Sequence, residues 1–146
     1  GVKNIMVRDC QFLGTDVGLR FKSTRGRGGV VENIYIDGIS MYNIVEDAIT
    51  FDLYYGGKSV TDDMDGIEQG MGKALNKADE TTPCFRDIHI ENIICRGAHR
   101  ALYFNGLPEM PISNINLRNI YITADKEGEF NYCEGIKKEN VNIQKR

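Results

Sequence analysis

Five segments of the chain share one alternating pattern of apolar and polar residues. They begin at Asn4, Asn33, Asp87, Asn114 and Asn140, and in each the Asn or Asp is followed by Ile or Val. The alternation has the period of a strand that buries one face, and no segment has the i, i+3, i+4 spacing of a helix. The chain therefore contains an internal repeat of β-strands.

The spacing of the repeat predicts how the strands stack. The first residues lie 29, 54, 27 and 26 positions apart, so we interpret the 54 as two coils of 27, with a more elaborate coil hidden inside it. Aligning the copies predicts three inward columns of side chains. These are Ile5, Ile34, Ile88, Ile115 and Val141; Val7, Ile36, Ile90, Leu117 and Ile143; and Phe12, Met41, Cys95 and Ile122.

A second apolar motif follows the first in three of the copies. It reads Gly18-Leu19-Arg20-Phe21, Ala48-Ile49-Thr50-Phe51 and Ala101-Leu102-Tyr103-Phe104. Each coil therefore has at least two strands, which counts against a leucine-rich repeat with its single strand and helical or irregular arm. Stacked coils bury an interior that no coil can bury alone. We expect an all-β fold, a right-handed parallel β-helix of about five coils of 26–30 residues.

We expect residues 1–146 to form a single partial β-helix domain, because this length suffices for one core. The pattern lapses at about residues 56–83, which we interpret as a loop excursion with one short helix near residues 70–75.

A full core strand opens the chain, with no polar capping element before it. Solenoid ends need such a cap. We therefore expect an exposed apolar end around Val2, Ile5 and Val7, which missing amino-terminal coils or another copy of the chain would cover.

Composition narrows the possible partners. The net charge of -3 and the pI of about 5.4 do not provide the summed positive potential that binding to nucleic acid or to an anionic membrane requires. No window approaches the roughly 18 apolar residues of a membrane span. We expect neither partner. The cysteines, Cys10, Cys84, Cys95 and Cys133, lack zinc spacing, and free, partly buried thiols are the preferred interpretation, with one disulfide as the alternative.

The strand around Phe21 carries two cations on one face. Leu19 and Phe21 are expected to point inward, so Arg20 and Lys22 point outward, roughly 7 Å apart. On composition alone, a solvated charged strand edge explains this pattern equally well.

The neighbouring coils add polar and aromatic groups to this face. The predicted register places Thr50 and Asp52 beside the two cations, and Tyr103 and Asn105 one coil further on. A guanidinium can bind a carboxylate through two parallel hydrogen bonds, an ammonium adds a point charge, and tyrosine offers a flat ring and a hydroxyl. Such a face suits a sugar acid.

The run from Gly14 to Ser23, with the following run from Arg25 to Ile34, resembles family 28 glycoside hydrolases, the polygalacturonases and their relatives. In that family an Arg-x-Lys strand binds the carboxylate of a galacturonate residue. Arg20 and Lys22 match this strand, with Phe where Ile is common. Tyr55 matches a tyrosine at the end of the next coil's equivalent strand. The resemblance implies that these three residues bind substrate, that the substrate is galacturonan or pectin, and that the protein is extracellular or periplasmic.

The family's catalytic motifs do not occur before Arg20 in this sequence. They are an Asn-Thr-Asp strand, an Asp-Asp pair and a Gly-His-Gly loop, all upstream of Arg-x-Lys. The resemblance implies inverting hydrolysis of α-1,4-galacturonan by two carboxyl groups roughly 6.5 to 9.5 Å apart. Thr15-Asp16 only partly matches these motifs and is not assigned as the acid. We expect the carboxyl-terminal part of such a hydrolase, which on its own binds but does not turn over.

Two alternatives remain open, a non-catalytic pectin-binding module and a pectate lyase-like protein. The lyase needs calcium-binding acidic residues, for which Asp52 alone is too little. We expect neither a metal nor a cofactor. His89 and His99 lack a third ligand and are interpreted as surface residues. The aspartates at positions 62, 63 and 65 lack the spacing of a calcium loop.

Overall fold

The computed structural model describes residues 1–54 and 77–146, and the regular elements in these ranges are β-strands. They are β1 (Val2–Leu13), β2 (Leu19–Lys22), β3 (Val30–Tyr42), β4 (Asp47–Asp52), β5 (Cys84–Asn105), β6 (Ile112–Asn131) and β7 (Cys133–Lys145). Within the described residues, no helix has the length and apolar character that crossing a bilayer requires. The helix expected near residues 70–75 and most of the excursion at 56–83 lie outside the described residues.

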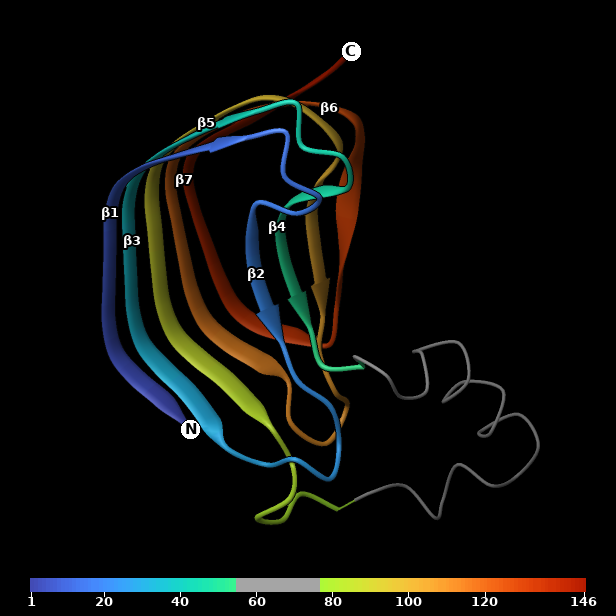
Figure 1. The fold of residues 1–146 in the computed structure, drawn as a ribbon. Coiled ribbons are helices and arrows are strands. Elements are labelled where there is room, and N and C mark those ends of the chain that lie inside the picture. The colour runs from blue at the N-terminus through green and yellow to red at the C-terminus, as the bar shows by residue number, and fades with distance from the viewer. Residues whose placement is uncertain (55–76) are drawn as a thin grey trace, which may run out of the picture.

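The strands stack in parallel as the coils of a right-handed β-helix. Strands β1, β3, β5, β6 and β7 pair in this order along one wall, which Figure 1 shows as a curved row of long strands. The opposite wall consists of β2, β4 and the later parts of β5 and β6. The all-β parallel β-helix that the repeat predicts is confirmed.

The inward columns run along the axis of the coils. Ile5 pairs with Ile34, Ile34 with Ile88 and Ile88 with Ile115, as the alignment predicts. Ile88 and Ile115 are fully buried, and so is Cys95 in the third column. Burying aliphatic side chains on both walls provides the stability that no single coil has.

The second wall adds a row of aromatic rings to the core. Phe21 stacks on Phe51 with ring centroids 4.3 Å apart and planes 6° apart. Phe51 then contacts Phe104 at 4.5 Å, and Phe104 contacts Phe130 at 4.7 Å. Neighbouring strands lie about 4.8 Å apart, so equivalent rings in successive coils meet at contact distance.

The predicted hidden coil does not exist. Strand β3 pairs directly with β5, with Ile34 beside Ile88, so no coil stacks between them. The interpretation of the spacing as two coils was therefore wrong.

The last coil pairs differently from the prediction. Val141 was aligned with Ile115, but it pairs with Ile120, and Ile115 pairs with Ile136. The next inward residue of that copy, Ile143, was aligned with Leu117 but pairs with Ile122. Every long strand bends twice, and in the preceding coil an Asn stands at both bends. The repeat therefore cannot tell which bend the last Asn matches.

These bends are held by residues with positive φ. The first bend has Asn4, Asn33, Asp87, Asn114 and Gly135, and the second has Asp9, Gly38, Asn92, Asn119 and Asn140, with φ between 51° and 78°. Glycine, Asn and Asp tolerate this region better than other residues. The amides also bond along the stack, since Asn119 Nδ2 donates to Asn92 Oδ1 at 3.3 Å and Asn140 Nδ2 donates to Asn119 Oδ1 at 3.0 Å.

The first coil leaves apolar surface uncovered. Val2 is 49% exposed and Ile5 is 43% exposed. They border a hollow of about 450 Å³ that Val7, Leu19 and Phe21 also line. The expected exposed apolar end is confirmed.

All four cysteines are free thiols, which confirms the preferred interpretation. Cys84 and Cys95 are buried, whereas Cys10 and Cys133 are partly buried. Burial raises the pKa of Cys95 to about 11 and that of Cys133 to about 11.

Replacing Asn119 tests the left-handed bends. In an ordinary strand, Gly is less stable than Ala. At Asn119 we expect the reverse order. Asn119→Ala should cost about 2 kcal/mol, from backbone strain and two lost hydrogen bonds between exposed side chains, and Asn119→Gly about 1 kcal/mol less than that. Urea denaturation of both variants measures this order, and the same pair at Asn116, whose φ is not positive, should show the usual order. An Ala variant at position 119 as stable as the Gly variant would contradict the role of the bends.

The raised thiol pKa values predict a loss of stability at high pH. The pKa of cysteine in the unfolded chain is about 8.5, so the unfolded state loses protons first and becomes favoured as the pH rises from there toward the folded pKa. The urea midpoint should therefore decrease as the pH is raised from 8 to 10.5, and Cys95→Ala should reduce this decrease.

Thiol alkylation tests the burial of the cysteines. Mass spectrometry after iodoacetamide treatment at pH 8 should show Cys10 modified before Cys95. Equal modification of the two would contradict this account.

Candidate functional site

The two cations of the Arg-x-Lys strand lie on the outer face of the second wall. Along β2, Leu19 is buried and Phe21 is partly buried on the ring of Phe51, whereas Arg20 and Lys22 are exposed. Side chains alternate along a strand, so anchoring Phe21 inward turns both cations outward. The predicted orientation is confirmed.

The same face continues across the next coils in the predicted register. Arg20 pairs with Thr50 and Lys22 with Asp52, and the next coil adds Tyr103 and Asn105. One coil further, β6 contributes Glu129 and Asn131 at these positions. At these two positions the outer face therefore has two cations at β2, one carboxylate at β4, no charge at β5 and one carboxylate at β6.

The carboxylate next to Lys22 has a structural task. Asp52 Oδ1 accepts hydrogen bonds from the backbone N–H of Tyr54 at 2.9 Å and from Asn105 Nδ2 at 3.4 Å. Asn105 is 3% exposed, and its Oδ1 is buried without a hydrogen-bond partner. Asp52 thus fixes the turn after β4.

Arg100 lies between a carboxylate and an aromatic ring on this wall. Its Nε donates to Asp47 Oδ1 at 2.6 Å and its Nη2 to Asp47 Oδ2 at 3.1 Å, and its guanidinium lies 3.7 Å from the centre of the Tyr103 ring. The hydrogen bonds to Asp47 raise the pKa of Arg100, and burial raises the pKa of the Tyr103 hydroxyl. Tyr103 therefore stays neutral near pH 7 and can donate a hydrogen bond.

The remaining candidates do not join this face. Tyr55 lies outside the described residues. His99 is exposed and lies 3.4 Å from Asp125, and His89 stacks on the ring of Tyr35. Neither histidine belongs to a group that could hold a metal, because no group of three or more His, Cys, Asp or Glu suited to a metal ion occurs in residues 1–54 and 77–146.

The ion pairs nearest to this face, Asp47–Arg100 and Arg25–Glu109, were not predicted from the sequence. Asp47 and Arg100 stand at the same position of successive copies, before Ala-Ile-Thr-Phe and Ala-Leu-Tyr-Phe, so the alignment held a usable signal. The pair between Arg25 and Glu109 lies between two irregular turns, for which the repeat gives no register.

Comparisons with known proteins agree with the fold. Residues 1–142 match the model of glycosyl hydrolases family 28. A stretch of 59 residues is 46% identical to a polygalacturonase of Ralstonia solanacearum, covering 38% of this chain and 11% of that protein. Over 137 residues, or 92% of this chain, it is 39% identical to 27% of a probable polygalacturonase of Arabidopsis thaliana.

The chain therefore spans about a tenth and about a quarter of the length of these two relatives. The family match, in contrast, extends over nearly all of the chain. With the parallel coils described above, these findings show that the chain belongs to family 28 of the glycosyl hydrolases.

Proposed function

We propose that this chain is the carboxyl-terminal part of a polygalacturonase-like hydrolase and that Arg20 and Lys22 bind the carboxylate of a galacturonate unit in galacturonan. The observation that carries the proposal is the pair of exposed cations on one outer face, held by the inward packing of Leu19 and Phe21. Family membership makes the polysaccharide the expected partner.

The physical case rests on complementary geometry. Arg20 offers a planar fork that matches a carboxylate, and Lys22 offers a mobile ammonium on the same side of the strand. The Phe21 ring between them is fixed by its stack on Phe51, so the two side chains start from a rigid base. Tyr103 pairs with Thr50 on the outer face and would offer its hydroxyl to a neighbouring sugar.

Hydrolysis in this proposal needs carboxylates from outside this chain. Inverting hydrolysis uses one carboxyl group as acid and another to activate water. We propose that these come from amino-terminal coils that also cover Val2 and Ile5, and that Tyr55 completes the substrate contacts. Residues 1–146 would then be one partial β-helix domain of a parent protein outside the cytoplasm, extracellular or periplasmic. The upstream coding sequence tests this directly, since it should contain Asn-Thr-Asp, Asp-Asp and Gly-His-Gly.

A non-catalytic pectin-binding module is the second candidate. It is favoured by the sequence itself, which carries the Arg-x-Lys strand without the family's aspartate motifs. Release of reducing ends from polygalacturonate by this chain would contradict it. The lyase interpretation receives no support from the family match, which is to hydrolases.

Alanine variants of the two cations test the binding proposal. A hydrogen bond to a charged group contributes roughly 1.5 to 3 kcal/mol, so Arg20→Ala and Lys22→Ala should each weaken trigalacturonate binding about tenfold or more. Titration calorimetry measures the dissociation constants. Lys137→Ala, an exposed cation on the other wall, is the matched control and should bind like the wild type. Unchanged affinity in both Arg20→Ala and Lys22→Ala would contradict the proposal.

A further inference from the structure

The strand that carries the two cations has few backbone hydrogen bonds of its own, although Leu19 and Phe21 anchor its inward side. Strand β2 has four residues, and among the described strands it pairs only with β4. A short edge strand has few ladder hydrogen bonds and opens readily. Whatever fixes the chain just after Lys22 therefore also determines where the Lys22 ammonium lies.

The turn after Lys22 docks on two neighbouring segments. Ser23 N donates to Asp52 O at 3.0 Å, which continues the pairing with β4. The amides of Gly26 and Gly28 both donate to Thr81 O, at 3.0 and 2.9 Å. The turn thus depends on the segment around Thr81, which precedes β5.

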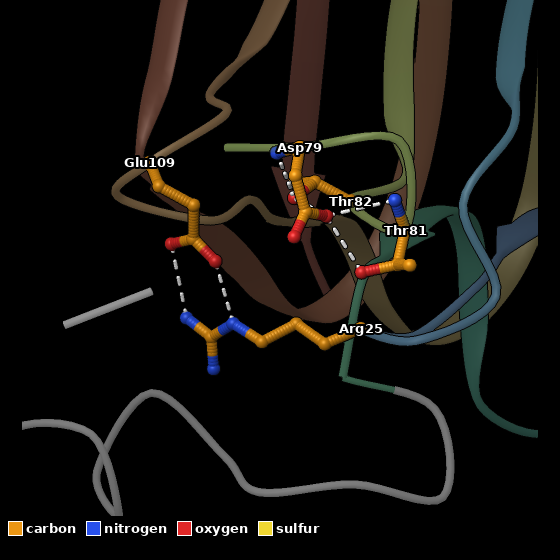
Figure 2. A network of polar contacts seen from close by, with 5 residues as sticks. All are labelled: Arg25, Asp79, Thr81, Thr82 and Glu109. Atoms are coloured by element: carbon orange, nitrogen blue, oxygen red, sulfur yellow. Dashed lines mark hydrogen bonds and ion pairs between the residues drawn. The ribbon is translucent and has the colours of Figure 1, made fainter. Parts of the chain in front are cut away.

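That segment is itself held by a carboxylate. Asp79 Oδ1 accepts from the amide of Thr81 at 2.8 Å and from its hydroxyl at 2.7 Å, and the amide of Asp79 donates to the hydroxyl of Thr82 at 3.0 Å. Figure 2 shows this group beside the side chain of Arg25. Thr81 O is therefore a fixed acceptor for the turn.

Arg25 ties the same turn to the third coil. Its Nε donates to Glu109 Oε1 at 2.6 Å and its Nη2 to Glu109 Oε2 at 3.1 Å (Figure 2). Glu109 belongs to the turn between β5 and β6 that the bridge from Leu107 to Met110 closes. Its side chain is only 8% exposed, and that of Arg25 is 22% exposed. A bidentate pair with this little exposure fixes geometry as well as charge.

The tie passes over the second coil. The Arg25 guanidinium lies 5.4 Å from the centre of the Tyr54 ring, and Tyr54 is 7% exposed. Thr24, next to Arg25, forms a bridge with Tyr54. The side chain of Arg25, which follows β2, thus contacts Tyr54 after β4 and Glu109 after β5.

From these contacts we propose that Arg25 is a positioning residue, which through Glu109 holds the Arg20–Lys22 strand in its binding geometry. The proposal rests on the proposed binding of galacturonate by that strand. Arg25 itself need not touch the sugar. Loss of the tie frees the turn at Ser23, and the Lys22 ammonium then samples positions that a carboxylate cannot share with Arg20.

The decisive variant is Glu109→Gln, which keeps every cation of the face. If Arg25 bound the sugar directly, releasing it from Glu109 would leave trigalacturonate affinity unchanged or raise it. If Arg25 is instead a positioning residue, Glu109→Gln should bind trigalacturonate about tenfold more weakly, which is the size of coupling measured between residues of one network. Arg25→Lys, which keeps the charge but not the fork, should act in the same direction. Glu139→Gln, an exposed acid on β7, is the matched control.

Amide hydrogen exchange separates positioning from general loss of stability. In Glu109→Gln, the amides of Ser23, Gly26 and Gly28 should exchange about tenfold faster or more, whereas the amides of β6 should not change. If the amides of β6 also exchange faster, Arg25→Lys becomes the deciding variant, because it keeps the positive charge at position 25 and the negative charge of Glu109.

Glu109→Gln that binds trigalacturonate as tightly as the wild type, or a turn whose exchange is unchanged, would overturn the positioning role. A wild-type chain that does not bind trigalacturonate would instead overturn the proposed function. The exchange at Ser23 would then still decide whether the tie holds the strand.

Discussion

The structure depends on the vertical register between coils. Each long strand lies beside an equivalent strand, so a side chain is placed by the side chain above it and the one below it. Two bends per coil with positive φ prevent the strands from sliding, because a shift by one residue would force a bulky residue into the left-handed region and turn the inward column outward. The buried columns and the outer face both follow from this register.

The register also explains how a chemical face arises from residues far apart in sequence. Asp47 and Arg100 are 53 positions apart, yet they form a bidentate pair because they occupy the same place in successive coils. Arg25 and Glu109, 84 positions apart, meet for a different reason. They belong to turns, and turns of successive coils project on the same side of the solenoid, where one side chain can reach past its nearest neighbour.

Strand type, inward columns and the outward cations were predictable from the sequence because all three follow from alternation and repetition. Arg20, Thr50 and Tyr103 were aligned correctly for this reason. The sequence misled where the repeat was interrupted. The spacing between Asn33 and Asp87 suggested an extra coil, which the direct pairing of β3 with β5 excludes, and Asn140 matched two bends equally well. The tie from Arg25 to Glu109 was beyond prediction, because irregular turns carry no period from which a contact can be inferred.

The two ends of the described solenoid differ in what they offer to another protein surface. At the first coil, apolar side chains such as Ile5 stand beside strand edges whose backbone groups have no neighbour among the described strands. At the last coil, Lys138 lies over the ring of Phe130, with the ammonium 4.2 Å from its centre, and β7 is rich in exposed charged residues. Lysines on an edge oppose strand addition. The described surfaces of β1 and β7 therefore differ in how readily another strand would pair with them. Among the described strands, the charges on β7 make it a poorer surface for strand addition than the apolar side chains beside β1.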